Sequence, residues 1–315
     1  MSPATDGTGG CPDRIVVVDW SAAARPRTGR DSIWQADLGP GGALALTNPA
    51  TRTGWAAAAS ASLGAQVAAG DRVLLAIDAG LGFPRGLAAA LGCSGGDGGA
   101  GAGAGGERGD GGAVAWRSVC RLLDELVSDD ASNANNRFDV ADELNRRCGA
   151  TGPTGGPFWG HPHGRSWTAL GPRRPTPPLR TASGVVLDEW REAEVVARRA
   201  GWRIQPVWKL FGAGSVGSQT LLALTWVERL RREPALSGRL RVWPQDTGAT
   251  PDPWGGEPGV VVVECWPPAF VDVTAHDVRD AAQVIGTARH LRDRCRWDRV
   301  PAPAAEEGWI VGLPM

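Results

Sequence analysis

The sequence predicts an α/β protein in which a mixed sheet, made of an antiparallel meander plus parallel strands, is flanked by helices. Three runs rich in valine, isoleucine and leucine, at residues 14–20, 72–78 and 259–265, have the composition of strands buried on both faces. Short turns containing Gly or Pro join the first run to two further strand patterns, which is typical of a meander. Helical patterns separate the other runs, as crossovers between parallel strands require.

The first third of the chain supplies most of the expected sheet. Residues 31–38 and 43–47 are the second and third strands of the meander, and the Ala-rich run 51–69 has helical periodicity. The strand at 72–78 follows this helix. Beyond it, residues 94–112 are almost entirely Gly, Ala and charged residues, so we expect a flexible Gly-rich loop over about 92–113.

A long segment at about 115–257 separates this loop from the strand at 259–265, and we interpret it as a large helical and loop-rich insertion. The last clear helix is expected over about 274–294. Residues 1–13 are expected to be disordered, and residues 14–315 to form one domain. Within the insertion, helical patterns occupy residues 115–126, 137–148, 186–200 and 217–232.

Composition excludes several classes of function. Lys and Arg total 33 and Asp and Glu total 34, so the net charge of −1 gives no general attraction to nucleic acid or anionic membrane. The N-terminus lacks the pattern of a secretion signal, and no apolar run approaches the roughly 18 residues of a membrane span. Six cysteines lie far apart without a CxxC pair, which favours reduced thiols and a cytoplasmic protein.

Acidic residues end the three buried-type strands. Asp19, Asp78 and Glu264 each lie at or near the carboxyl end of a strand, and a late helix adds Asp277 and Asp280. Functional groups gather at such strand ends, where side chains leave the packed layer. Carboxylates that converge in one cleft repel one another unless a cation neutralises them. The pattern therefore predicts a site for Mg²⁺ or Mn²⁺, which prefer oxygen ligands.

Simpler interpretations apply to single members of this set. An acid after a strand is often only a polar turn residue. Asp277 follows Thr274 at the spacing of a capping box, with Thr274 as the N-cap of the last helix. Asp280 has no such explanation, and helical projection places it at the margin of the face that packs on the sheet.

Four segments together carry a resemblance to a known family. VVVDWS, LLAIDAGLGFP, VVVVECWPP and HDVRDAAQV, in this order, resemble the ribonuclease-H-like superfamily, and within it they are most similar to domain-of-unknown-function family 429. The resemblance implies a ribonuclease-H-like sheet and an acidic metal centre carried by Asp19, Asp78, Glu264 and Asp280. It also implies nuclease activity, which in that family is itself predicted from fold.

The chain departs from the superfamily pattern in two respects. The acid that ribonuclease H carries on its first helix has no counterpart within residues 51–70, so Glu264 would substitute for it. The middle of the chain, residues 92–257, has no equivalent in a minimal nuclease.

The segment Gly212-Ala-Gly214-Ser215-Val-Gly217 has the G-x-G-x-x-G pattern of dinucleotide-binding loops. The stretch before it contains Pro206 and Lys209, and the expected acid about 20 residues later is missing. Three interpretations remain: a dinucleotide site, a phosphate site formed by the helix entry, or tight packing. The residues that would bind a phosphate are Gly212, Gly214, Ser215, Gly217 and Ser218.

Residues 161–180 form a loop with several arginines, no acid, and Trp167 for stacking. This composition suits a local lip that binds nucleic acid or a nucleotide, although a solvated Pro-rich loop with codon-biased arginines is the simpler interpretation. The arginines of the lip are Arg165, Arg173, Arg174 and Arg180.

The favoured function is metal-dependent hydrolysis of a phosphoester, with nucleic acid as a candidate substrate. Asp19, Asp78 and Asp280 would hold the ions, and Glu264 would complete the shell or orient water. One alternative is an actin-like or sugar-kinase-like protein that binds Mg-ATP. Another is a non-catalytic nucleotide-binding protein that uses the loop at residues 212–217.

Overall fold

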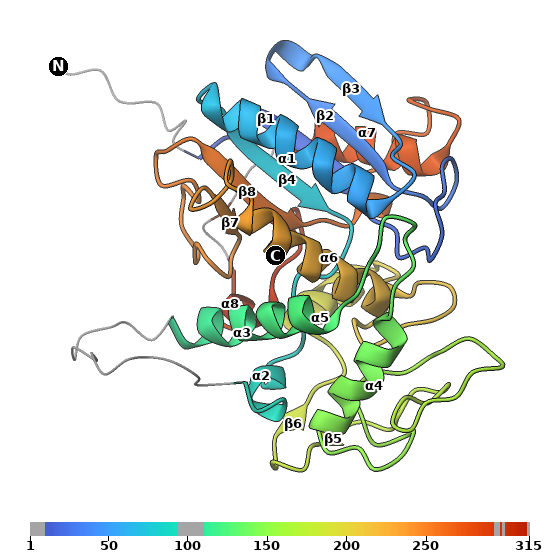
Figure 1. The fold of residues 1–315 in the computed structure, drawn as a ribbon. Coiled ribbons are helices and arrows are strands. Elements are labelled where there is room, and N and C mark those ends of the chain that lie inside the picture. Colours follow the sequence, from blue (N-terminus) through green and yellow to red (C-terminus); the bar gives the residue numbers. More distant parts are fainter. Residues whose placement is uncertain (1–9, 94–109, 293–296, 298–299, 314–315) are drawn as a thin grey trace, which may run out of the picture.

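The computed structural model describes residues 10–93, 110–292, 297 and 300–313. Within this part of the chain, the centre is a six-stranded sheet with the order β3-β2-β1-β4-β8-β7 (Figure 1). β1, β2 and β3 pair antiparallel, whereas the pairs β1/β4, β4/β8 and β8/β7 are parallel. The α/β class and the mixed sheet are therefore confirmed. The strands are β1 (Arg14–Asp19), β2 (Trp34–Leu38), β3 (Leu44–Thr47), β4 (Arg72–Ile77), β7 (Leu240–Val242) and β8 (Gly259–Glu264).

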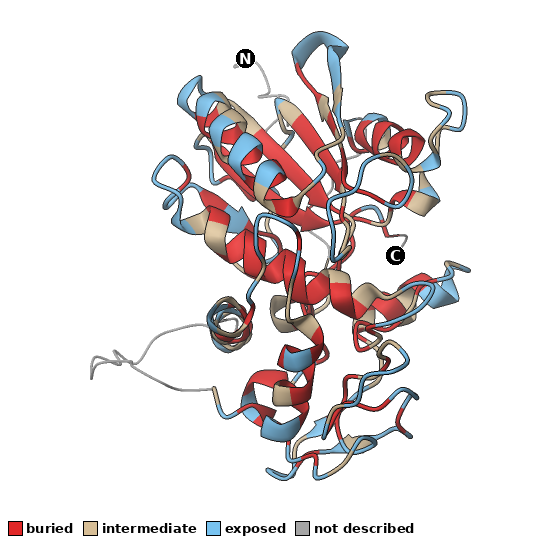
Figure 2. Cartoon of the chain, turned by 45° about the vertical axis from the view of Figure 1, so that its right-hand side comes forward, coloured by how far each residue is buried: buried red, intermediate tan, exposed pale blue. Residues whose placement is uncertain are grey.

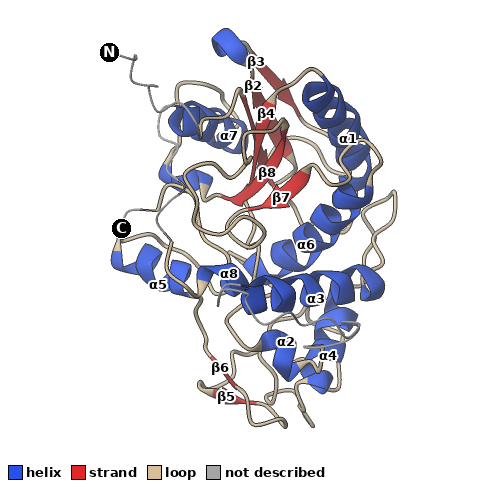
Figure 3. Ribbon diagram, turned by 90° about the vertical axis from the view of Figure 1, so that its left-hand side faces the viewer, coloured by secondary structure: helices blue, strands red, loops and turns tan. Residues whose placement is uncertain are grey.

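Alternate side chains of the central strands enter two hydrophobic cores. Val16 and Val18 of β1 belong to the core shared with α1 and α6, whereas Ile15 and Val17 belong to the core shared with α7. Figure 3 shows α7 on one face of the sheet and α1 and α6 on the other. Burial on both faces explains why the sequences of these strands are continuous apolar runs. The helices are α1 (Arg52–Ala68), α6 (Val216–Arg232) and α7 (Arg279–Arg292).

Residues 116–170 lie below the sheet in Figure 1 and pack into the same core as α1, whereas Ala193 and Ala197 pack into the core of α7. Phe83, which follows β4, contacts Phe158 and Trp208 with ring centroids 5.6 and 5.4 Å away. Figure 2 shows buried residues continuing from the sheet into this layer. The remaining elements are η1 (Pro40–Gly42), α2 (Leu87–Ala90), α3 (Asp110–Leu126), α4 (Arg137–Arg147), β5 (Leu179–Arg180), β6 (Val186–Leu187), α5 (Glu192–Arg199), η2 (Pro267–Ala269) and α8 (Ala304–Glu307).

The register of the central strands brings their carboxyl ends level. Val18 of β1 pairs with Ile77 of β4, and Ile77 pairs with Glu264 of β8. Asp19 directly follows Val18, and Asp78 directly follows Ile77. The three acids expected at strand ends therefore lie along one edge of the sheet.

The helix expected at 186–200 is shorter in the structure. Val186–Leu187 pairs with Leu179–Arg180 in a small hairpin, and α5 begins only at Glu192. The Glu194 carboxylate accepts a hydrogen bond from the Arg191 backbone N–H at 3.0 Å, which caps the helix there. The prediction is therefore wrong for residues 186–191.

Two other boundaries also differ. The last helix begins at Arg279, because Thr274 donates through its hydroxyl to Asp272 at 2.7 Å and lies in a turn. The capping box of Thr274 with Asp277 is therefore wrong, and residues 293–294 lie outside the described residues. The second strand begins at Trp34, because Asp31 has a φ of 54° and lies in a turn.

Two expected flexible segments fall largely outside the described residues, namely 1–9 of the N-terminus and 94–109 of the Gly-rich loop. Asp13 donates a backbone hydrogen bond to Arg72 at 2.8 Å, so the described part of residues 1–13 departs from the expected disorder. Residues 110–113 belong to α3, so the loop ends earlier than expected. None of the described helices combines the length and the apolar character needed to cross a membrane.

Candidate functional site

Asp19 and Asp78 are neighbours at the carboxyl edge of the sheet. Asp19 ends β1 and Asp78 follows β4, and the parallel pairing of these strands places the two residues side by side. Both are partly exposed in the wall of a cleft of about 1090 Å³. The other walls come from the β1–β2 connection, the loop before α6 and the start of α7.

A third carboxylate enters the same cleft from a helix. Asp280 lies in the first turn of α7 and lines the cleft with Asp19 and Asp78. Its Oδ2 accepts a hydrogen bond from the Asp31 backbone N–H at 2.6 Å, which ties α7 to the β1–β2 connection. Asp277 lies in an exposed turn and is not part of the cleft wall. The structure therefore brings together three of the acids that the sequence singled out.

The three carboxylates repel one another. Burial raises the pKa of Asp19 well above its usual value, and the charges of Asp78, Asp280 and Asp31 raise it further. Burial also raises the pKa of Asp78 to about 7, with additional contributions from Glu264 and Asp280. Among the described residues, no basic side chain forms an ion pair with Asp19, Asp78 or Asp280. A bound cation would relieve this repulsion.

The donor set suits a hard divalent cation. Mg²⁺ and Mn²⁺ prefer carboxylate oxygens, and Mg²⁺ commonly keeps several waters while binding only one or two carboxylates. Over the described ranges, no three His, Cys, Asp or Glu side chains are already positioned to hold one ion. The cleft therefore fits an ion bound partly through water better than one enclosed by protein ligands.

Glu264 does not belong to this group of acids. Its two oxygens accept hydrogen bonds from the Arg191 guanidinium at 2.7 and 2.6 Å, and the Leu81 backbone N–H donates to Oε2 at 2.9 Å. Arg191 also donates to Glu194 at 3.1 Å, and all three charged side chains are buried. The structure does not support Glu264 as a metal ligand or a water-orienting residue, because Arg191 and the Leu81 N–H already bind both of its oxygens.

Part of the glycine-rich loop lines the cleft. Gly212, Gly214 and Ser215 face the same cleft as the carboxylates, and φ values of 86° and 68° at the two glycines make a turn that side chains disfavour. Residues 203–211, all of them described, form no strand of the central sheet. The loop therefore lacks the preceding buried strand that a dinucleotide fold requires.

The rest of the loop packs against its surroundings. A Cβ at Gly217 would lie 2.4 Å from the Val207 carbonyl oxygen, so only glycine fits there. Ser218 is buried, and its hydroxyl donates to the Leu210 carbonyl at 2.6 Å. Gly217 and Ser218 therefore have structural roles, and the structure does not support them as phosphate ligands.

Arg137 also lines the cleft, although the sequence pattern did not single it out. Arg137 is the first residue of α4, where the helix dipole disfavours a cation. This unfavourable position is the one sequence signal that could have marked Arg137 as a functional residue. Its Nε donates to Ser218 Oγ at 2.9 Å and its Nη1 to Asn135 Oδ1 at 2.7 Å. The exposed arginines that line the same cleft are Arg27, Arg30 and Arg279.

None of the residues of the expected basic lip, 161–180, lines the cleft, although Trp167 contacts Phe138 with ring centroids 5.5 Å apart. Arg165 lies 4.7 Å from the Trp167 ring centroid and 3.7 Å from the Asp139 carboxylate. Arg174 pairs with Glu189. The loop itself contains no acid, but acids from other segments pair with Arg165 and Arg174. The other two arginines of the expected lip are Arg173 and Arg180.

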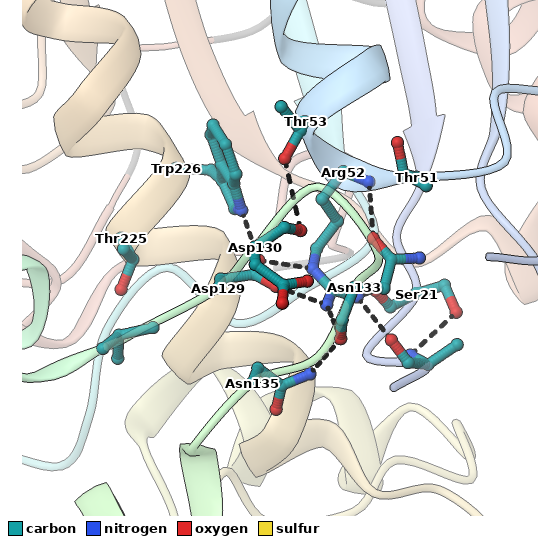
Figure 4. A network of polar contacts seen from close by, with 12 residues as sticks. Ser21, Thr51, Arg52, Thr53, Asp129, Asp130, Asn133, Asn135, Thr225 and Trp226 are labelled. Carbon is teal, nitrogen blue, oxygen red and sulfur yellow. Dashed lines mark hydrogen bonds and ion pairs between the residues drawn. The ribbon is translucent and has the colours of Figure 1, made fainter. Parts of the chain in front are cut away.

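A buried network behind the cleft holds the wall that carries Ser21 and Ala23 (Figure 4). The Arg52 guanidinium donates two hydrogen bonds to the Asp129 carboxylate, at 2.6 and 2.7 Å. It also donates to the backbone carbonyls of Ser21 and Ala23, both at 2.9 Å. Trp226 of α6 donates through Nε1 to Asp129 at 2.7 Å. The network joins α1, the insertion and the cleft wall.

Trp226→Phe is expected to lower the free energy of unfolding by about 1–2 kcal/mol, because it removes one hydrogen bond to a buried charged group and keeps most of the aromatic volume. Urea unfolding followed by circular dichroism measures the change. Trp167→Phe is the matched control, since it removes the hydrogen bond from Nε1 to the exposed Asp139 and should have a smaller effect. Equal losses for the two variants would show that burial of Asp129 does not matter.

No protein-family model, no curated protein and no solved structure matches this chain.

Proposed function

We propose that this protein is a divalent-metal-dependent hydrolase of phosphoester bonds, built on a ribonuclease-H-like sheet and acting on nucleic acid. One observation carries the proposal: Asp19, Asp78 and Asp280 converge in a single cleft with no ion-pair partner among the described residues. Their mutual repulsion raises the pKa of Asp19 and Asp78. Carboxylates in such an arrangement favour binding of a cation.

The strand order supports the ribonuclease-H-like part of the proposal. The first strand lies between an antiparallel meander and the parallel strand β4, as the resemblance of the sequence motifs implies. Because one fold serves many functions, the acidic cleft supports the proposed function more strongly than the strand order does.

In the proposed reaction, Asp19 and Asp78 would hold Mg²⁺ or Mn²⁺ at the sheet edge, and Asp280 of α7 would contribute through bound water. The bound ion would polarise a phosphoryl oxygen and lower the pKa of a water molecule. Asp280 also accepts the hydrogen bond from Asp31, so the β1–β2 connection orients its carboxylate. The arginines of the cleft attract the negatively charged substrate.

A second candidate function is nucleotide binding in the same cleft, instead of hydrolysis of a phosphoester. Gly212, Gly214 and Ser215 lie in the same cleft as the carboxylates, and backbone N–H groups at a helix start bind phosphate readily. This favours an actin-like or sugar-kinase-like protein that binds Mg-ATP, or a non-catalytic nucleotide-binding protein, as the alternative.

The proposal includes a cytoplasmic location. Free thiols are typical of proteins in reducing compartments. The described cysteines, all free, are Cys11, Cys93, Cys120, Cys148 and Cys265.

The proposal is tested by titrating the protein with Mn²⁺ in a calorimeter. Asp19→Asn is expected to weaken Mn²⁺ binding at least about tenfold, because it removes one charged ligand. In EDTA the same variant should keep or raise the melting temperature, because it relieves repulsion. Asp277→Asn is the matched control, since this exposed acid lies outside the cleft and should leave both values unchanged.

A variant at Asp19 that is less stable than the wild type, yet gains the wild-type stabilisation from Mn²⁺, would contradict the metal assignment. Single-stranded DNA, RNA and ATP, each offered with Mn²⁺, separate the two candidate functions. Cleavage of nucleic acid that Asp19→Asn abolishes supports the hydrolase. Stabilisation by ATP without cleavage supports the alternative.

A further inference from the structure

Arg137 is a half-buried cation that forms no ion pair with a carboxylate of the described residues. Its two side-chain hydrogen bonds go to the Ser218 hydroxyl and the Asn135 amide oxygen, both uncharged. The nearby carboxylate of Asp129 is already held by Arg52 and Trp226. Buried charges normally occur with an opposite charge, and no ion pair among the described residues offsets the charge of Arg137.

The surroundings of Arg137 increase this imbalance. Burial, and then the positive charge of Arg52, lower the pKa of Arg137 to about 10 against the opposing effect of Asp129, so the guanidinium is still charged at neutral pH. Its bond to Ser218 holds it beside the first turn of α6, where the helix dipole is also positive. An anion bound in the cleft would stabilise this arrangement.

An exposed aromatic ring lies next to this cation. Phe211 lines the cleft and is 42% exposed, which is unusual for a side chain of this size. Its ring contacts Phe138 edge to face, with centroids 6.4 Å apart, and the Arg137 guanidinium lies 4.4 Å from the centroid of that same Phe138 ring. Phe138 itself is buried. Phe138 therefore forms a common base for the Arg137 cation and the accessible Phe211 ring in the cleft.

We propose that Arg137 and Phe211 form a nucleotide-binding subsite, in which the guanidinium binds a phosphate and the Phe211 ring stacks on a base. The inference rests on the proposed function and specifies its substrate: a ligand that carries both an anionic group and a flat ring. Stacking requires an unpaired base, so a single-stranded region is preferred to a duplex. The same chemistry is offered by a nucleotide within a strand and by a free nucleotide such as ATP.

The subsite is tested by the fluorescence anisotropy of a labelled oligothymidylate in EDTA, so that neither metal binding nor cleavage contributes. Arg137→Gln is expected to weaken binding about tenfold or more and to reduce the slope of log affinity against log salt by about 0.7, the value for one phosphate contact on a single strand. Phe211→Ala should weaken binding about 5- to 150-fold with little change in the salt slope. Arg137→Lys should restore the salt slope.

Arg146→Gln is the matched control, because it removes one charge from the same helix at an exposed position paired with Glu143. It should change affinity far less than Arg137→Gln. Arg137→Gln should also keep the melting temperature of the wild type, since it removes a buried charge. A large loss of stability, or wild-type affinity and salt slope in Arg137→Gln, would overturn the subsite.

Competition distinguishes the two sources of the ligand. Displacement of the oligonucleotide by unlabelled single strand at lower concentration than by ATP assigns the subsite to a nucleic-acid strand, and the reverse order assigns it to a free nucleotide. Displacement by inorganic phosphate as effectively as by either ligand would reject the stacking role of Phe211. A wild-type protein that binds neither strand nor ATP in EDTA would reject the subsite. The Mn²⁺ titration would still decide the metal site separately.

Discussion

Arg191→Leu is expected to lower the free energy of unfolding by about 3–5 kcal/mol, because it leaves buried charges without a partner. The Arg191 side chain is 1% exposed and binds both Glu194 and Glu264, which are also buried. Without the guanidinium, these two carboxylates would remain in the core with no counter-charge. Urea unfolding followed by circular dichroism measures the loss.

Arg174→Leu is the control for this variant. It breaks the ion pair with Glu189, but the Arg174 side chain is 51% exposed, so the loss should stay below about 1 kcal/mol. The effect of Arg191→Leu should also shrink between pH 8 and pH 5, because protonation removes the unpaired charges. Burial already raises the pKa of Glu194 to about 7. Similar losses of stability for Arg191→Leu and Arg174→Leu would show that burial of the Arg191 ion pairs does not increase their contribution to stability.

Asp78→Asn is expected to reduce the proposed hydrolysis at least about a hundredfold, because it removes a charged metal ligand and keeps the size of the side chain. The rate of cleavage of a labelled oligonucleotide with Mn²⁺ measures this effect. Asp277→Asn should cleave at the wild-type rate. Full activity in Asp78→Asn would exclude this carboxylate from the reaction.

Asp78→Asn is also expected to change the pH dependence of the melting temperature. The pKa of Asp78 is raised to about 7 in the folded protein, so the folded state holds this proton more tightly than the unfolded chain. Without metal, the contribution of Asp78 to stability therefore falls as pH rises from about 4 to 7. In EDTA, the melting temperature should decrease from pH 5.5 to pH 8, and Asp78→Asn should reduce that decrease. An identical pH dependence in both proteins would contradict the raised pKa.

The sheet and its acidic edge could be predicted because their signals are local. Strands buried on both faces leave continuous apolar runs in the sequence, and Asp19 and Asp78 directly follow such runs. Asp280 was also predictable, because helical periodicity places it at the margin of the buried face of α7. Boundaries were predicted less well: α5 and α7 both begin later than their helical patterns, where turns and caps compete with the helix.

The sequence by itself determined the α/β class, the mixed sheet and the edge at which the acids gather. These features depend on the apolar periodicity of strands and helices, which involves only residues close together in the sequence. Only the tertiary structure decided which charges are free and which are paired. Glu264 has the same position in the sequence pattern as Asp19, but Arg191, 73 residues earlier, neutralises it. Arg137 shows the opposite case, since the fold places this cation in the cleft and gives it no ion pair within the described part of the chain. Pairings between distant segments depend on how the elements pack, and no local pattern records them.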